Sequence, residues 1–262
     1  MARLAEDANI EDHASDHAQT ALAGLRRSFD TYYRDHARAK RMHALNASLV
    51  PSGAVVFDIG AHVGDRTGSF LRLGAQVVAL EPQPLLFRAL RRLYGRCPKA
   101  TLRAEAVGAK NGETDLYLNP SNPTIATTSP AFLAAADGAE GWEAETWTGQ
   151  TRVPVTTLDA LIETYGPPGF IKIDVEGHEP EVLAGLSTAI PLLSFEFTTI
   201  QRQAAQTCID RLCSLGRYQF NFSLGEDHAM QLETWVDGGE MGQRIDALPH
   251  AANSGDVYAR LV

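Results

Sequence analysis

From residue 54 onward, short apolar runs alternate with helical patterns. The runs are rich in β-branched and aromatic residues, which is typical of strands buried on both faces. They predict strands at residues 54–60, 76–82, 100–107, 114–118, 151–156, 170–177, 191–197, 218–222 and 256–262, with helices at 65–73, 84–94, 157–165, 179–186 and 200–215. The Asn-Gly pair in KNGE (110–113) predicts a tight turn, so the strand at 114–118 is expected to fold back as a hairpin. Strands that alternate with helices predict an α/β fold, a mainly parallel sheet covered on both faces.

The first 50 residues carry a different pattern, in which apolar residues recur at spacings of three and four. This periodicity predicts an amphipathic helix. The segment Pro51-Ser52-Gly53 ends the pattern. We therefore predict a helical extension over residues 1–50 and one domain over 51–262. The apolar stripe of the extension suits packing on the domain or on a second copy of the chain.

Residues 119–150 form a segment longer than an ordinary connection between elements. Its aromatic side chains, Phe132, Trp142 and Trp147, argue against pure disorder. We predict an insertion that covers the ligand site as a lid. The alternative is a peripheral element whose aromatic side chains cover an edge of the sheet.

Composition narrows the class of partner. The chain has 262 residues with 23 basic and 32 acidic side chains, a net charge of −9. Such a surface repels phosphate backbones, so we expect no nucleic-acid partner. No stretch approaches the roughly 18 apolar residues of a membrane span, and the first residues lack the apolar centre of a signal peptide. With three scattered cysteines, we expect a soluble, cytoplasmic protein without a membrane partner.

Acidic residues recur where the predicted strands end. Ligands of open α/β sheets bind at the carboxyl ends of the strands. The acids at those ends are Asp58, Glu81, Glu105, Asp174, Glu176 and Glu196. Six acids around one rim indicate a site for hydroxyl and cationic groups.

The loop after the first strand decides which nucleotide-like ligand fits. A dinucleotide fold favours G-x-G-x-x-G, but here only Gly60 fits, because His62 and Asp65 occupy the other two positions. Asp58, Gly60 and Gly64 instead make D-x-G-x-x-x-G. This loop suits a ligand without phosphate and with a cationic amino-acid part, such as S-adenosylmethionine. The alternatives are a structural turn or another nucleotide.

Glu81, at the end of the second strand, supports the same interpretation. An acid at this place accepts hydrogen bonds from both ribose hydroxyls. A nicotinamide-dependent oxidoreductase is disfavoured by the missing glycines. A module that binds S-adenosylmethionine without catalysis remains a rival interpretation.

Four motifs resemble a known family. They are VVFDIGAHVGDRT (55–67), VVALEPQP (77–84), VTTLDAL (155–161) and FIKIDVEGHEPEVLAGL (170–186). Together they resemble the FkbM family of S-adenosylmethionine-dependent methyltransferases over about residues 54–200. The resemblance implies the Rossmann-like class I methyltransferase fold, a seven-stranded sheet with an antiparallel last strand. It also implies methyl transfer to oxygen, often a hydroxyl of a sugar or a natural product.

The resemblance also implies roles for individual residues. Asp58, Gly60 and Gly64 correspond to the cofactor loop, and Glu81 corresponds to the ribose acid. The other expected cofactor contacts are His62, which stands where the family usually has Asn, together with Gln83, Glu105, Ala106 and Asp174. Glu105 and Ala106 correspond to the adenine pocket.

Asp174 is the candidate catalytic residue, because it ends the strand beside which the transferred methyl group is expected. As a general base it would take the proton of a substrate hydroxyl. The alternative is that it binds the cofactor or caps the following helix. For the hydroxylated small-molecule substrate we predict contacts with Asn122, Thr124, Glu176, His178 and Glu196. We expect no metal, with Mg²⁺ on Asp174, Glu176, His178 and Glu179 as the alternative.

Overall fold

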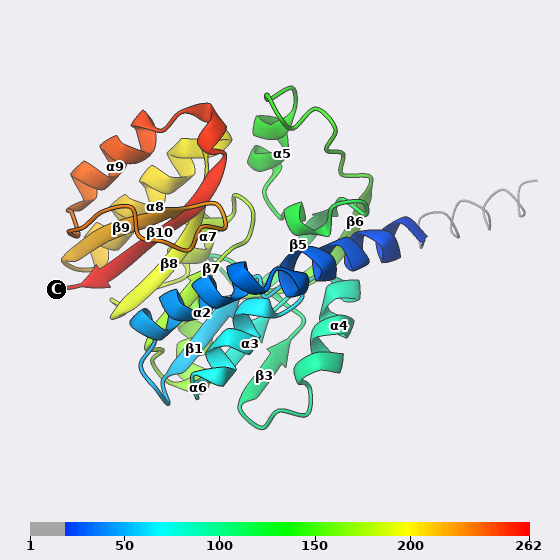
Figure 1. Cartoon of the computed structure of the whole chain (residues 1–262), viewed down its shortest axis with the longest axis horizontal. Helices are drawn as coiled ribbons and strands as arrows, with labels where there is room; N and C mark the ends of the chain where they lie inside the picture. Colours follow the sequence, from blue (N-terminus) through cyan, green and yellow to red (C-terminus); the bar gives the residue numbers. More distant parts are fainter. Residues whose placement is uncertain (1–18) are drawn as a thin grey trace, which may run out of the picture.

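The central feature of the molecule is a seven-stranded sheet, seen in a computed structural model that describes residues 19–262 (Figure 1). The strands follow the order β3-β2-β1-β7-β8-β10-β9. Their bounds are β1 Val55–Ile59, β2 Gln76–Leu80, β3 Ala100–Arg103, β7 Phe170–Ile173, β8 Leu192–Thr198, β9 Tyr218–Leu224 and β10 Ser254–Leu261. Strand β10 is antiparallel to both of its neighbours, and the other pairs are parallel. This confirms the predicted α/β fold with an antiparallel last strand.

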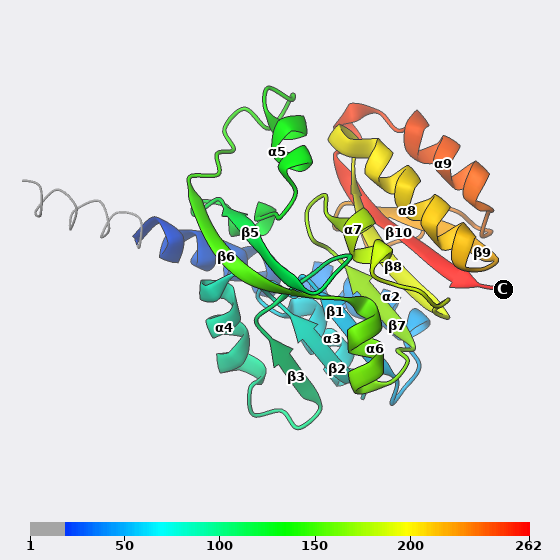
Figure 2. The same cartoon turned by 180° about the vertical axis from the view of Figure 1, so that it is seen from behind.

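Both faces of the sheet are buried under helices. In β1, Phe57 and Ile59 belong to one apolar cluster and Val56 to another, because successive side chains point to opposite faces. The first cluster includes side chains of α6 (Leu158–Tyr165), α7 (Glu179–Ala184), α8 (Arg202–Leu215) and α9 (Gly238–Ala247). The second includes side chains of α3 (Asp65–Arg72) and α4 (Pro84–Tyr94). Burial on both faces explains the unbroken apolar runs. Figures 1 and 2 show the two helix layers from opposite sides.

Helix α9 was not predicted from the sequence. Three of its ten residues are Gly238, Gly239 and Gly242, and glycine is a poor helix former. Asp237 compensates at the N-terminus, where its side chain accepts a hydrogen bond from the backbone N–H of Glu240. Tertiary packing supplies the rest, because Met241 and Ile245 are fully buried.

A second, smaller sheet corrects two predictions. It has the order β4-β6-β5, with β4 Ala106–Val107, β5 Gly112–Leu118 and β6 Gly149–Thr156. The predicted strand at 100–107 is therefore two strands in different sheets, and the large sheet does not extend through every strand of the domain. The predicted hairpin is also wrong, since β5 pairs antiparallel with β6, which lies between β4 and β5. This pairing lets Leu116, Val153 and Ala106 form an apolar cluster of their own.

The N-terminal extension is two helices within the described residues, not one. Residues 19–34 are helical, and α2 (His36–Leu49) follows. Asp35 causes the break, because its side chain caps α2 by accepting a hydrogen bond from the backbone N–H of Arg38. Helix α2 lies against α3, where the Asn46 amide donates to the Ser69 hydroxyl at 3.0 Å. The extension thus packs on the domain; the first 18 residues of the predicted helix lie outside the described residues.

The segment 119–150 contains a short 3₁₀ turn at Pro123–Ile125 and helix α5 (Pro130–Ala136). Two further 3₁₀ turns lie at Thr199–Gln201 and His250–Ala252. The Phe132 side chain is fully buried, and Trp142 and Trp147 meet its ring edge-on. Within residues 19–262, none of the helices has the length and apolarity that a membrane span requires.

Candidate active site

A cleft opens at the carboxyl ends of β1, β2 and β7, beside the small sheet. Its lining comes from segments at 58–66, 81–83, 105–107, 124–128 and 174–176, together with Tyr32, Arg38, Leu116 and Glu226. Seven of the lining residues carry carboxyl groups and two are arginines. The wall is therefore strongly acidic, as a ligand with a cationic group requires.

The floor of the cleft depends on Gly60, which directly follows β1. Its φ is +79°, and an added Cβ would collide with the backbone carbonyl of Asp174. The loop after β1 thus passes against the end of β7 more closely than any side chain allows. Gly64 also has a positive φ of +83°, and an added Cβ there would meet Leu90 and Tyr94. The glycines of the predicted loop are explained by this close packing.

Glu81 joins the loops that follow β1 and β2. One carboxyl oxygen accepts a hydrogen bond from the backbone N–H of His62 and the other from that of Gln83, both at 2.8 Å. The side chain is 2% exposed, and burial raises the pKa of Glu81 to about 7. Each oxygen keeps a free lone pair, so the group is able to accept two further hydrogen bonds from a ligand.

Asp58 and His62 occupy the wall between these loops. The Thr67 hydroxyl donates to the Asp58 carboxyl at 2.5 Å, and burial raises the pKa of Asp58 to about 6. His62 adopts a φ of +51°, a left-handed conformation uncommon for a residue with a side chain. Burial lowers the pKa of His62 to about 4, so its ring is neutral. The ring lies 3.3 Å from the Ser28 hydroxyl and edge-on to Tyr32.

Asp174 ends β7 and takes part in a buried ion-pair network. The Lys172 ammonium lies 3.2 Å from Asp174 and 2.7 Å from Asp256 on β10. Lys172 is 2% exposed, while the Asp174 side chain is partly exposed to the cleft. The lysine therefore fixes one oxygen of Asp174 and leaves the carboxyl group accessible from the cleft.

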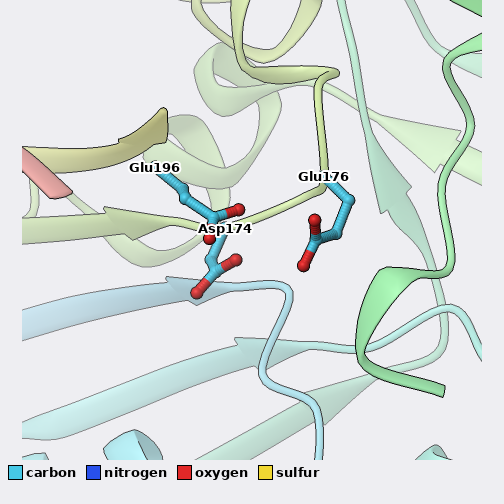
Figure 3. Close-up of side chains that lie close together, drawn as sticks. All are labelled: Asp174, Glu176 and Glu196. Atoms are coloured by element: carbon cyan, nitrogen blue, oxygen red, sulfur yellow. The ribbon is translucent and has the colours of Figure 1, made fainter. Parts of the chain in front are cut away.

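Two glutamates approach Asp174. Glu176 follows β7 with a φ of +55°, and Glu196 lies on β8. One carboxyl oxygen from each of the three residues lies within 4.8 Å of the others (Figure 3). Burial and the neighbouring negative charges raise the pKa of both glutamates well above its usual value. His178 and Glu179, the other ligands of the predicted Mg²⁺ alternative, are absent from this group.

Most of the predicted site residues meet at the cleft. Those that line it are Asp58, Gly60, His62, Glu81, Gln83, Glu105, Ala106, Thr124, Asp174 and Glu176. Glu196 and Gly64 do not line it: Glu196 lies close to Asp174, and Gly64 supports the loop after β1. Asn122 and His178 are not among the lining residues: the Asn122 amide donates to Glu145, and His178 lines a separate groove beside β4 and β6.

The polar and charged lining residues that the sequence did not predict for the site are Tyr32, Arg38, Asp65, Arg66, Thr128 and Glu226. Arg38 lies 2.9 Å from Asp65 and 2.8 Å from Glu226, and its guanidinium covers the Tyr32 ring. A signal for Arg38 existed, because it shares a helix face with the buried Met42 and Asn46 at spacings of four. Nothing in the sequence marked the loop that carries Glu226.

Comparison with known proteins decides the family. The model of the methyltransferase FkbM domain matches residues 58–224, which is more than half of the chain. The chain belongs to the FkbM methyltransferase family. The recognition made from its four motifs is thereby confirmed.

One curated relative is hexuronic acid methyltransferase AglP of Haloferax volcanii. This FkbM-family chain is 27% identical to it over 162 residues, which cover 61% of each protein. The match thus spans less than two thirds of the relative. Among solved structures, an O-methyltransferase from Bacillus cereus in complex with SAH has a TM-score of 0.47 and 12% identity, covering 95% of this chain and 91% of that one. Precorrin-6y C5,15-methyltransferase from Geobacter metallireducens has a TM-score of 0.43 and 13% identity, covering 85% and 87%.

The residues of this FkbM methyltransferase fit the cofactor that its family uses. Glu81 has unused lone pairs for ribose hydroxyls, and Gly60 leaves the loop backbone uncovered. The excess of carboxyl groups in the wall suits the positive sulfur and ammonium of S-adenosylmethionine. Asp58, His62, Gln83, Glu105 and Ala106 line the same cleft.

Proposed function

We propose that this methyltransferase transfers a methyl group to a hydroxyl oxygen of a sugar or of another hydroxylated small molecule. The observation that carries the proposal is the position of Asp174. Its carboxyl group is exposed to the cleft beside Gly60 and is held by Lys172. A carboxylate at this place is suited to orient a hydroxyl group and to accept its proton.

Bound S-adenosylmethionine supplies a methyl group on a cationic sulfur, which is a strong electrophile. The protein residues therefore need mainly to align the acceptor oxygen and to exclude water. Asp174 fits the first task. Segment 119–150 suits the second, because Thr124, Ala126 and Thr128 line the cleft. We extend the proposal to this segment as a cover over the acceptor site.

The acceptor class is inferred from two lines of support. The name of AglP assigns a hexuronic acid to that relative, which favours a sugar here. The carboxyl group of Glu176 lines the cleft beside Asp174 and is suited to accept a hydrogen bond from a sugar hydroxyl. Asn122 and His178, which the sequence also suggested for the substrate, are too poorly placed in this arrangement to be included.

Turnover measurements test the proposal. The purified full chain is incubated with radiolabelled S-adenosylmethionine and a panel of neutral sugars, hexuronic acids and hydroxylated natural products. We expect transfer of label to an acceptor oxygen, located by mass spectrometry. Tight binding of S-adenosylhomocysteine without transfer to any compound would favour a binding module, and label on nitrogen or carbon would contradict the proposal.

Asp174→Asn separates the two roles of this residue, because the amide keeps the shape and removes the charge. If Asp174 is the base, we expect kcat to fall by about 10²- to 10⁴-fold while S-adenosylhomocysteine affinity stays within about twofold. Glu181→Gln, an exposed acid on α7, is the matched control. A loss of cofactor affinity with unchanged kcat would instead assign Asp174 to cofactor binding.

A further inference from the structure

The three carboxyl groups beside the cleft come from two neighbouring strand ends. Asp174 and Glu176 follow β7, and Glu196 lies near the end of β8, which pairs with β7 in parallel. Their nearest oxygens lie within 4.8 Å of one another, and Figure 3 shows the three side chains turned toward one space. The fold therefore concentrates up to three negative charges at one point.

This group is short of hydrogen-bond partners. Glu176 is 6% exposed, yet among the residues the structure describes its carboxyl group has no hydrogen bond or ion pair. In the same part of the chain, one carboxyl oxygen of Glu196 is buried without a partner. Buried polar groups are normally paired, so the buried, unpaired oxygen of Glu196 beside two other carboxyl groups calls for a ligand.

The protein itself supplies little positive charge here. Lys172 contacts Asp174 at 3.2 Å, but its closer partner is Asp256 at 2.7 Å. Asp256 also pairs with Arg66 at 3.5 Å, but neither cation forms an ion pair with Glu176 or Glu196 among the described residues. A small cation of higher charge would remove the repulsion and satisfy the unpaired oxygens.

We propose that Asp174, Glu176 and Glu196 bind one divalent cation of the oxygen-preferring kind, such as Mg²⁺ or Mn²⁺. These ions bind carboxylate oxygens at about 2.0–2.1 Å, so ligand oxygens lie roughly 3–4 Å apart around them. The three nearest carboxyl oxygens, all within 4.8 Å of one another, are already close to this spacing. The proposal departs from the expectation of no metal, and it replaces His178 and Glu179 of the earlier alternative with Glu196.

The cation has a role in acceptor recognition, an extension that rests on the proposed function. Three carboxylates leave several coordination positions of an octahedral ion free. These positions suit two neighbouring oxygens of an acceptor, for example a hydroxyl beside a carboxylate. A cation also explains how an acidic acceptor binds in a cleft with seven carboxyl groups.

Direct metal binding tests the site without any turnover. The full chain is stripped with chelator and titrated with Mn²⁺, and free Mn²⁺ is measured by electron paramagnetic resonance. We expect one bound Mn²⁺ per chain, displaced by Mg²⁺. Absence of Mn²⁺ binding at millimolar concentration would overturn the proposal, whatever the variants show.

Variants locate the bound ion. Glu176→Gln and Glu196→Gln should each weaken Mn²⁺ binding by more than about tenfold, whereas the control Glu181→Gln should leave it unchanged. Thermal unfolding and S-adenosylhomocysteine affinity report whether each variant is folded. Unchanged Mn²⁺ affinity in both folded variants would place the ion elsewhere and contradict the proposal.

The role in acceptor binding has its own readout. Where an acceptor is found, chelator should raise its KM, and Mg²⁺ should restore it. Mn²⁺ binding without any methyl transfer would overturn the proposed function and leave the metal site standing. Transfer that ignores chelator, in a chain that binds Mn²⁺, would refute the acceptor role alone.

Discussion

Replacement of Glu81 by glutamine should weaken S-adenosylhomocysteine binding strongly at pH 8 and only slightly at pH 5.5. At pH 8 the wild-type side chain is a carboxylate, and loss of its charge-assisted hydrogen bonds to ribose costs about 1.5–3 kcal/mol, or roughly 10- to 150-fold in affinity. At pH 5.5 most of the wild-type group is protonated, because burial raises the pKa of Glu81 to about 7. The difference between the two proteins should therefore shrink.

The sign follows from proton linkage. Ribose hydroxyls donate to the carboxylate and so favour its charged form, which lowers the pKa of Glu81 in the complex. Binding then releases a proton, and affinity rises with pH. If only the carboxylate binds, a pKa of about 7 gives an increase of up to roughly thirtyfold between pH 5.5 and pH 8. Glu81→Gln should lose this part of the pH dependence.

Isothermal titration calorimetry at pH 5.5, 7 and 8 measures both effects, and buffers of different ionisation enthalpy count the released protons. Glu181→Gln is the charge-matched control. The variant also loses an acceptor for one of two backbone N–H groups, so its thermal midpoint must be recorded. An equal loss of affinity at all three pH values would refute the reasoning from the raised pKa. Unchanged affinity at pH 8 would remove Glu81 from the cofactor site.

Two further predictions concern the packing of the cleft. Gly60→Ala should abolish measurable S-adenosylhomocysteine binding in calorimetry, because the added Cβ meets the Asp174 carbonyl; Gly138→Ala, also at positive φ but with open space, should leave binding unchanged. Arg38→Gln should lower the free energy of urea unfolding by about 3 kcal/mol, because it leaves the largely buried Asp65 unpaired. Arg34→Gln, whose ion pair is exposed, should cost less than about 1 kcal/mol, and equal effects of both arginine variants would contradict the assignment.

The sequence predicted most of the central sheet and many of the residues that line the cleft. Strands buried on both faces read as apolar runs, so most strands of the large sheet and their mainly parallel arrangement followed from local composition. Gly60 and Glu81 were also predictable, since both stand at fixed places after strands whose carboxyl ends meet. Local sequence patterns are sufficient to predict Gly60 and Glu81 because the place of each residue depends only on the strand that it follows.

Tertiary structure alone decided the features that depend on distant segments. The predicted strand at 100–107 divides between two sheets because its second half, β4, pairs with β6, and β5 also pairs with β6 instead of folding back on β4. The Asn-Gly turn signal is local, so it does not show which strands pair with each other. Arg38 reaches the cleft because α2 packs on α3. There the Arg38 guanidinium pairs with Glu226, which lies 188 residues further along the chain. The same holds for Glu196, which meets Glu176 only because β8 lies beside β7. Pairing across the sheet brings charges together at a separation in sequence that no local pattern records.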